Sequence, residues 1–157
     1  MPICRATHFM QEGERIMKWK DKCFDALDAA NMFESSGHRT RFKELIDCYH
    51  GYPFFTKGLC KCMYLSAWDE EHFCVILGAL ADMTAGRDQD TQEMRSKGEC
   101  FAEEQTNDEY YVYELSNAFL DNKPFHLTAS QNITPGVRHI ISQALKASDI
   151  IDHVDGF

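Results

Sequence analysis

Apolar residues recur at intervals of three and four positions along most of this chain, and this spacing restricts what the chain can fold into. Between Gln11 and Met32, for example, Ile16, Cys23 and Leu27 fall on one stripe. An α-helix turns once in about 3.6 residues, so residues at this spacing share one face, whereas a strand requires alternation at every second position. The sequence therefore predicts an all-α fold.

A compact bundle of about five to seven helices accommodates this pattern. Breaks at Gly51-Tyr52-Pro53 and Ala85-Gly86 divide the periodic stretches, and Thr134-Pro135 is typical of a helix start. We expect helices over about 11–32, 36–49, 55–67, 70–83, 88–105 with an interruption near Gly98, 107–121 and 134–148. The segment 110–113 is aromatic and β-branched, so a short strand pair is the alternative there.

A chain of 157 residues suits one domain, here 1–157, with 149–157 as a flexible tail. The run Phe73–Ala81 is almost entirely apolar, which makes its helix the expected central buried element. The side chains expected to be buried there are Phe73, Val75, Ile76, Leu77, Ala79 and Leu80. This run is too short to span a bilayer, which requires about 20 apolar residues. The N-terminus lacks the apolar region of a signal peptide. We expect a cytoplasmic protein that does not enter membranes.

The chain has seven cysteines, an odd number in a sequence without an export signal. In a reducing compartment this favours core residues, metal ligands or nucleophiles over disulfides. Three doublets of soft metal ligands follow one another at twelve-residue intervals: Cys48-x-His50, Cys60-x-Cys62 and His72-x-Cys74.

These doublets suggest a zinc site. Zinc takes four Cys and His ligands in a tetrahedron, and the candidate ligands are Cys48, His50, Cys60 and Cys62, with His72 and Cys74 as alternates. Residues i and i+2 of a helix point about 200° apart, so a C-x-C pair can chelate one ion only from a loop or a frayed turn. The alternative is that the cysteines are small apolar core residues.

Cysteine catalysis is the competing chemical interpretation, because a neighbouring histidine can activate a thiolate. The candidates are Cys4, Cys48 or Cys60 with His38, His72 or His126, and no local pattern selects among them. The chain has no phosphate-binding loop, G-x-S-x-G elbow, H-E-x-x-H motif or dinucleotide fingerprint. We therefore expect a protein that is not an enzyme.

The negative charge is concentrated in one third of the chain. Residues 69–121 include fourteen acidic and three basic residues, although the whole chain has a net charge of only −9. Such a field repels nucleic acid and attracts basic surfaces. Mutual repulsion costs stability, which a basic partner would relieve. The expected partner-facing surface consists of Asp88, Asp90, Glu93, Glu103, Glu104, Asp108 and Glu109.

The segments Met32–Ile46 (MFESSGHRTRFKELI) and Met63–Trp68 (MYLSAW) resemble small proteins of mobile elements and prophages of Gram-positive bacteria. The resemblance implies a setting in which small acidic proteins, anti-CRISPR inhibitors among them, block host defence nucleases. The resemblance does not assign a role to any individual residue. Together with the charge it predicts a non-enzymatic inhibitor of a basic nucleic-acid-handling protein, with Cas9 as the candidate target. The alternatives are a zinc-stabilised helical adaptor and a small cysteine- or metal-dependent enzyme.

Overall fold

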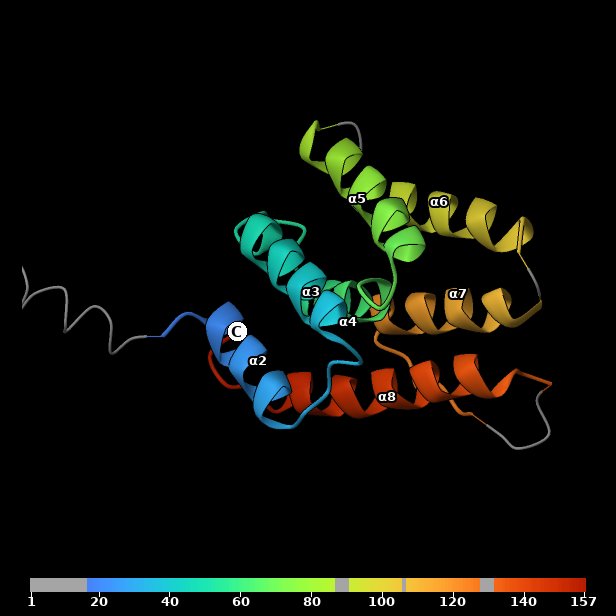
Figure 1. The fold of residues 1–157 in the computed structure, drawn as a ribbon. Coiled ribbons are helices and arrows are strands. Elements are labelled where there is room, and N and C mark those ends of the chain that lie inside the picture. Colours follow the sequence, from blue (N-terminus) through green and yellow to red (C-terminus); the bar gives the residue numbers. More distant parts are fainter. Residues whose placement is uncertain (1–16, 87–90, 106, 128–131) are drawn as a thin grey trace, which may run out of the picture.

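The computed structural model describes residues 17–86, 91–105, 107–127 and 132–157, and within them the fold is entirely helical (Figure 1). The helices are α2 (Trp19–Ala29), α3 (Ser36–Tyr49), α4 (Lys57–Ser66), α5 (Glu70–Thr84), α6 (Gln92–Glu103), α7 (Asn107–Leu120) and α8 (Pro135–Asp152). The predicted all-α bundle is thus confirmed. The alternative of a strand pair at 110–113 is wrong, because these residues form the middle of α7.

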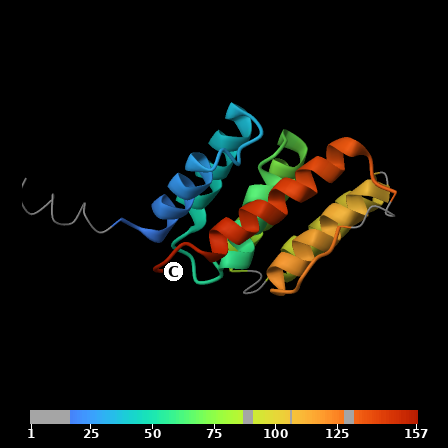
Figure 2. The same ribbon diagram turned by 90° about the horizontal axis from the view of Figure 1, so that it is seen from below.

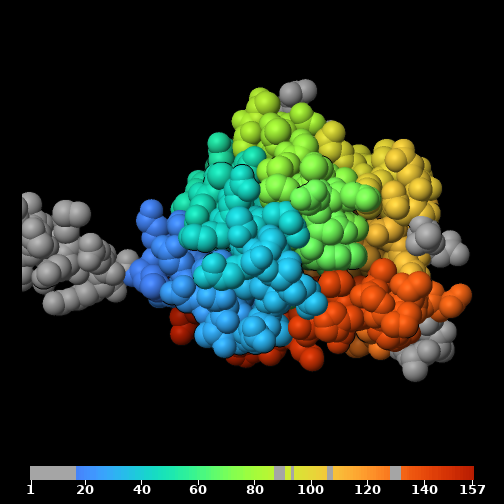
Figure 3. Space-filling view, in the orientation of Figure 1, coloured from blue at the N-terminus to red at the C-terminus, as the bar shows by residue number. Residues whose placement is uncertain are grey.

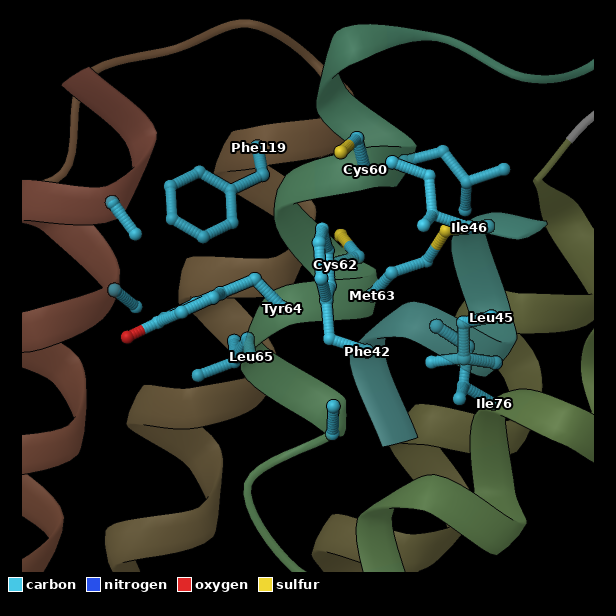
Figure 4. Packing of buried hydrophobic residues seen from close by; sticks show 14 of the residues in the cluster. Phe42, Leu45, Ile46, Cys60, Cys62, Met63, Tyr64, Leu65, Ile76 and Phe119 are labelled. Carbon is cyan, nitrogen blue, oxygen red and sulfur yellow. The ribbon is translucent and has the colours of Figure 1, made fainter. Parts of the chain in front are cut away.

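Helix α4 occupies the centre of the bundle. It packs against α3, α5, α7 and α8, and every residue from Leu59 to Leu65 is buried. Figure 4 shows its side chains pointing in several directions, toward Phe42 of α3 and Phe119 of α7 among others. Even Lys61 is buried, with its Nζ 2.8 Å from Oδ1 of Asp152 at the end of α8. A helix surrounded on all sides needs, at nearly every position, either an apolar residue or a side chain whose long aliphatic part can be buried.

Helix α5, expected to be central, lies instead at one edge. Ile76, Ala79 and Leu80 are buried, whereas Phe73, Val75 and Leu77 are only half-buried. The outer face of α5, which includes Glu71, Cys74, Gly78 and Ala81, is exposed. In Figure 1 this helix and α6 form the upper part of the molecule, away from α2 and α8.

Three helices begin with the same local hydrogen bond. The side chains of Ser35, Thr56 and Asp69 each accept a hydrogen bond from the backbone N–H three residues later, at 3.0, 3.1 and 2.8 Å. Each bond satisfies one of the free N–H groups of a helix N-terminus. The start of α8 also follows the prediction in position, with Thr134 before the helix and Pro135 in its first turn.

Several boundaries differ from the sequence expectations. The helix expected over about 11–32 is shorter at both ends, because Lys18 is extended, α2 begins at Trp19 and it ends at Ala29. Helix α6 continues through Gly98 without interruption, and a Cβ there would lie 3.3 Å from a ring carbon of Tyr113, so the glycine allows α6 and α7 to approach closely. Helix α8 continues to Asp152, beyond the expected start of the tail at 149. After the helix, the Val154 carbonyl accepts a hydrogen bond from Nε1 of Trp19 at 3.1 Å.

Helix α8 lies across the face seen in Figure 2, where it passes α2, α4 and α7. Among the described residues, no helix combines the length and the apolar character needed to cross a bilayer.

Candidate functional site

His72 holds together the part of the bundle that carries most of the negative charge. It lies in the first turn of α5, where its Nδ1 is 2.7 Å from Oδ1 of Asp69, the residue that caps the same helix. Its Nε2 is 2.9 Å from Oε2 of Glu109 on α7. The imidazole ring also stacks on Trp68 at 4.4 Å and meets the edge of Phe101 of α6 at 4.9 Å.

This environment keeps His72 protonated at neutral pH. Burial opposes the charged imidazolium, but the hydrogen bonds to Asp69 and Glu109 outweigh burial and raise the pKa of His72 to about 9. Burial alone would raise the pKa of Asp69, yet the hydrogen bonds from His72 lower it. The result is an imidazolium between two carboxylates that links α5 to α7.

The same geometry occupies both ring nitrogens of His72, so neither nitrogen is free to accept a proton from a thiol or hydroxyl. A cavity of about 50 Å³ lies beside it, lined in part by Arg95, Phe101 and Ser116. At roughly 10–15 Å³ per water on this measure, such a cavity has room for only a few water molecules. The arrangement serves structure rather than nucleophile activation.

His38, another candidate base, is also part of the core. Its Nδ1 accepts a hydrogen bond from the backbone N–H of Glu34 at 3.0 Å, and its Nε2 donates to the Tyr64 carbonyl at 2.8 Å. Burial lowers the pKa of His38, so the neutral ring suits this pair of bonds. The Tyr64 hydroxyl in turn donates to the carbonyl of Met32. His126 is exposed, and Cys4 lies outside the described residues.

The predicted zinc ligands do not converge. Cys60 and Cys62 are fully buried on different sides of α4. The Cys60 Sγ lies 3.8 Å from Sγ of Cys23 on α2, whereas the Cys62 thiol donates to the carbonyl of Ser116 on α7 at 3.4 Å. Burial raises the pKa of both thiols and so disfavours the thiolate that zinc requires.

The remaining candidate ligands lie elsewhere. Cys48 is exposed on α3, and Nδ1 of His50 donates to the carbonyl of Ile46 at 3.1 Å. Of the alternates, His72 is held by carboxylates and Cys74 is exposed on α5. Within the described ranges, no three His, Cys, Asp or Glu side chains are grouped to hold a metal ion. The residues present therefore do not fit one tetrahedral zinc site.

The predicted partner-facing acids divide into two groups. Glu103 and Glu104 are exposed, as expected. Asp108 is buried, and its Oδ2 accepts hydrogen bonds from the N–H and the hydroxyl of Thr134 at 3.2 and 2.7 Å. Glu109 is half-buried against His72. Asp108 and Glu109 thus hold α7 to α8 and α5. Asp88 and Asp90 lie outside the described residues, as does the side chain of Glu93.

Exposed glutamates lie on α5, α6 and α7, the helices that meet at His72, and at the end of α6. They are Glu70, Glu71, Glu99, Glu103, Glu104 and Glu114, and together we call them the acidic surface. Glu70 and Glu71 precede His72 directly, while Glu103 and Glu104 follow Phe101, whose ring touches His72. The contacts of His72 therefore bring two separate stretches of acidic sequence to one end of the molecule.

The glutamates of the acidic surface are not paired with basic side chains of the described residues. None of its six glutamates forms an ion pair within the described part of the chain. Of the basic residues on α6, Arg95 pairs with Asp121 at 2.7 Å and Lys97 pairs with Asp82 at 3.4 Å. Figure 3 shows α5 and α6, in green and yellow, forming the upper right of the visible face.

Comparison with protein-family models, with curated proteins and with solved structures finds no match for this chain.

Sequence reasoning considered His72 as an alternate zinc ligand and as a candidate base, but not as the partner of two carboxylates. The signal it missed is the Asp69-x-x-His72 spacing, which places the two side chains on one turn, within 2.7 Å. No signal pointed to Glu109, which is 37 positions away along the chain.

Proposed function

We propose that this protein is a non-enzymatic binding protein that docks its acidic surface on a basic surface of a nucleic-acid-handling protein. The observation that supports this is the set of six exposed glutamates, none of which forms an ion pair within the described ranges. Such a surface mimics the charge of a phosphate backbone and favours basic grooves.

The proposed partner class follows from charge and from the resemblance to proteins of mobile elements. A groove that binds nucleic acid is rich in Lys and Arg, and a rigid anionic surface can occupy it in place of the nucleic acid. The concrete candidate is a CRISPR effector nuclease such as Cas9. Occupation of its DNA channel would inhibit target binding.

The test is binding to purified Cas9 loaded with guide RNA, together with cleavage of a target plasmid, at several salt concentrations. We expect the affinity to fall as salt rises, mainly through a slower association rate. The triple variant Glu99→Lys, Glu103→Lys, Glu104→Lys should lose binding, since it changes the local charge by six units.

The matched control is the triple variant Asp25→Lys, Glu44→Lys, Asp155→Lys. These acids are also exposed, and their reversal changes the net charge by the same amount. They lie on α2, α3 and the C-terminal segment, away from the acidic surface. If both triple variants bind equally well, the acidic surface is a solubility feature and the proposal fails. If unaltered protein neither binds nor inhibits Cas9, that candidate fails, and a pull-down from bacterial lysate at low and high salt tests other basic partners.

A further inference from the structure

Two cysteines, Cys74 on α5 and Cys100 on α6, line the same shallow groove between these helices. Both are free and exposed, whereas Cys23, Cys60 and Cys62 are buried. Neither cysteine belongs to the acidic surface, and neither is among the residues that contact His72.

Contacts on either side of the two cysteines place them at the same level of the helix pair. On one side, a Cβ on Gly78 would lie 3.9 Å from Cδ of Lys97. On the other side, the ring of His72 lies 4.9 Å from the ring of Phe101. These contacts show that α5 and α6 run antiparallel. Because the cysteine of each helix lies between its two contact residues, Cys74 and Cys100 lie at a similar level along the groove that both line.

We propose that Cys74 and Cys100 form a redox-active dithiol that hydrogen peroxide converts to an intrachain disulfide. Peroxide oxidises one thiol to a sulfenic acid and releases one water molecule. The second thiol attacks that sulfur and releases a second water molecule, so two S–H bonds and one O–O bond become one S–S bond and two waters. A small dithiol reductant returns both thiols by exchange.

Cys23 and Cys60, whose sulfurs are in contact, do not meet the geometric requirement for a disulfide. The sulfurs of Cys23 and Cys60 are 3.8 Å apart, but the Cα atoms of α2 and α4 stay more than 8 Å apart. A disulfide requires a Cα separation below about 7 Å, so this pair would need backbone movement. Cys48 is exposed on α3 and is not among the residues that line the groove.

The experiment treats the full chain with hydrogen peroxide, blocks the remaining thiols with iodoacetamide, and measures intact mass and disulfide-linked peptides. Compared with untreated protein that is alkylated in the same way, the chain should carry two fewer carbamidomethyl groups, because the two thiols have instead lost two hydrogen atoms, about 2 Da, and a linked peptide pair should contain residues 74 and 100. The melting temperature of the oxidised protein should rise by roughly 5–10 °C, because the bond restricts the unfolded chain. Dithiothreitol should reverse both changes.

Cys74→Ser and Cys100→Ser should each abolish the linked peptide and the rise in melting temperature. Cys48→Ser, a change at an equally exposed thiol, should leave both intact. The proposal is overturned if the two thiols are recovered as separate sulfinic acids or as cross-links between chains. Because the readout is mass and melting temperature, its outcome is independent of any partner.

Discussion

Nε2 of His72 on α5 lies 2.9 Å from a carboxylate oxygen of Glu109 on α7, while Nδ1 of the same ring lies 2.7 Å from Asp69. One protonated ring therefore holds two helices together at the end of the molecule that bears the acidic surface. Its protonation state links the pH of the solution to the stability of this end.

Stability should fall as pH rises toward and beyond 9. The pKa of His72 is raised from 6.5 to about 9, so its contribution is fully present below 6.5 and is lost as pH rises through 9. A shift of this size corresponds to about 3 kcal/mol. Urea unfolding at pH 6, 7.5 and 9.5 measures it, and His72→Gln should remove most of the difference. If the His72→Gln variant loses as much stability between pH 6 and 9.5 as the unaltered protein, groups other than His72 cause the pH dependence.

Asp108 should contribute to stability although it belongs to the acidic third of the chain. Asp108→Ala leaves the N–H and hydroxyl of Thr134 without their acceptor at the start of α8, and we expect a loss of about 1–3 kcal/mol. Glu104→Ala is the control, because Glu104 is exposed, and its effect should stay within about 0.5 kcal/mol. Equal losses in the two variants would contradict the internal role of Asp108.

Gly58→Ala should destabilise the contact between α4 and α7. A Cβ at this position would lie 2.4 Å from the carbonyl oxygen of Phe119, so the two backbones must separate. We expect a loss of about 2 kcal/mol or more, the cost of forced overpacking. Gly51→Ala is the matched control, because a Cβ there meets no atom within 4 Å. Thermal unfolding of both variants distinguishes close packing from a general effect of removing glycine.

Cys62→Ser and Cys48→Ser should differ in their effects on stability. Cys62 is fully buried between α4 and α7, where a hydroxyl replaces a thiol in an apolar setting, and we expect a loss of about 1–2 kcal/mol. Cys48 is exposed, and its substitution should be neutral within about 0.5 kcal/mol. If the predicted zinc site existed, both variants and a chelator would lower the melting temperature together.

Helix positions could be predicted from the sequence because the information is local. The three–four spacing of apolar residues defines a face, and the capping side chains of Ser35, Thr56 and Asp69 act on N–H groups three residues away. Local information of this kind could not exclude the strand alternative at 110–113. Aromatic residues suit a strand as well as a helix, and only packing of α7 against α4 and α6 selects the helix.

Tertiary structure decided which charged residues are available to a partner. Glu103, Glu104, Asp108 and Glu109 look alike in sequence, yet the first two face solvent and the last two bond inward. The two thiols of the Cys60-x-Cys62 doublet likewise lie apart. Because α4 is surrounded by other helices, Cys60 points toward α2 and Cys62 toward α7.

The sequence by itself determined the helical class, the starts of most helices and the concentration of negative charge, because each depends on residues within a turn or on composition. Only the tertiary structure decided the pairing of His72 with Glu109, 37 positions apart, and of Asp108 with Thr134, 26 positions apart. The physical reason is that a carboxylate is buried only where donors from other helices offset the cost of removing it from water, and the local sequence does not show where such donors lie. The arrangement of helices around α4 brings those donors within reach.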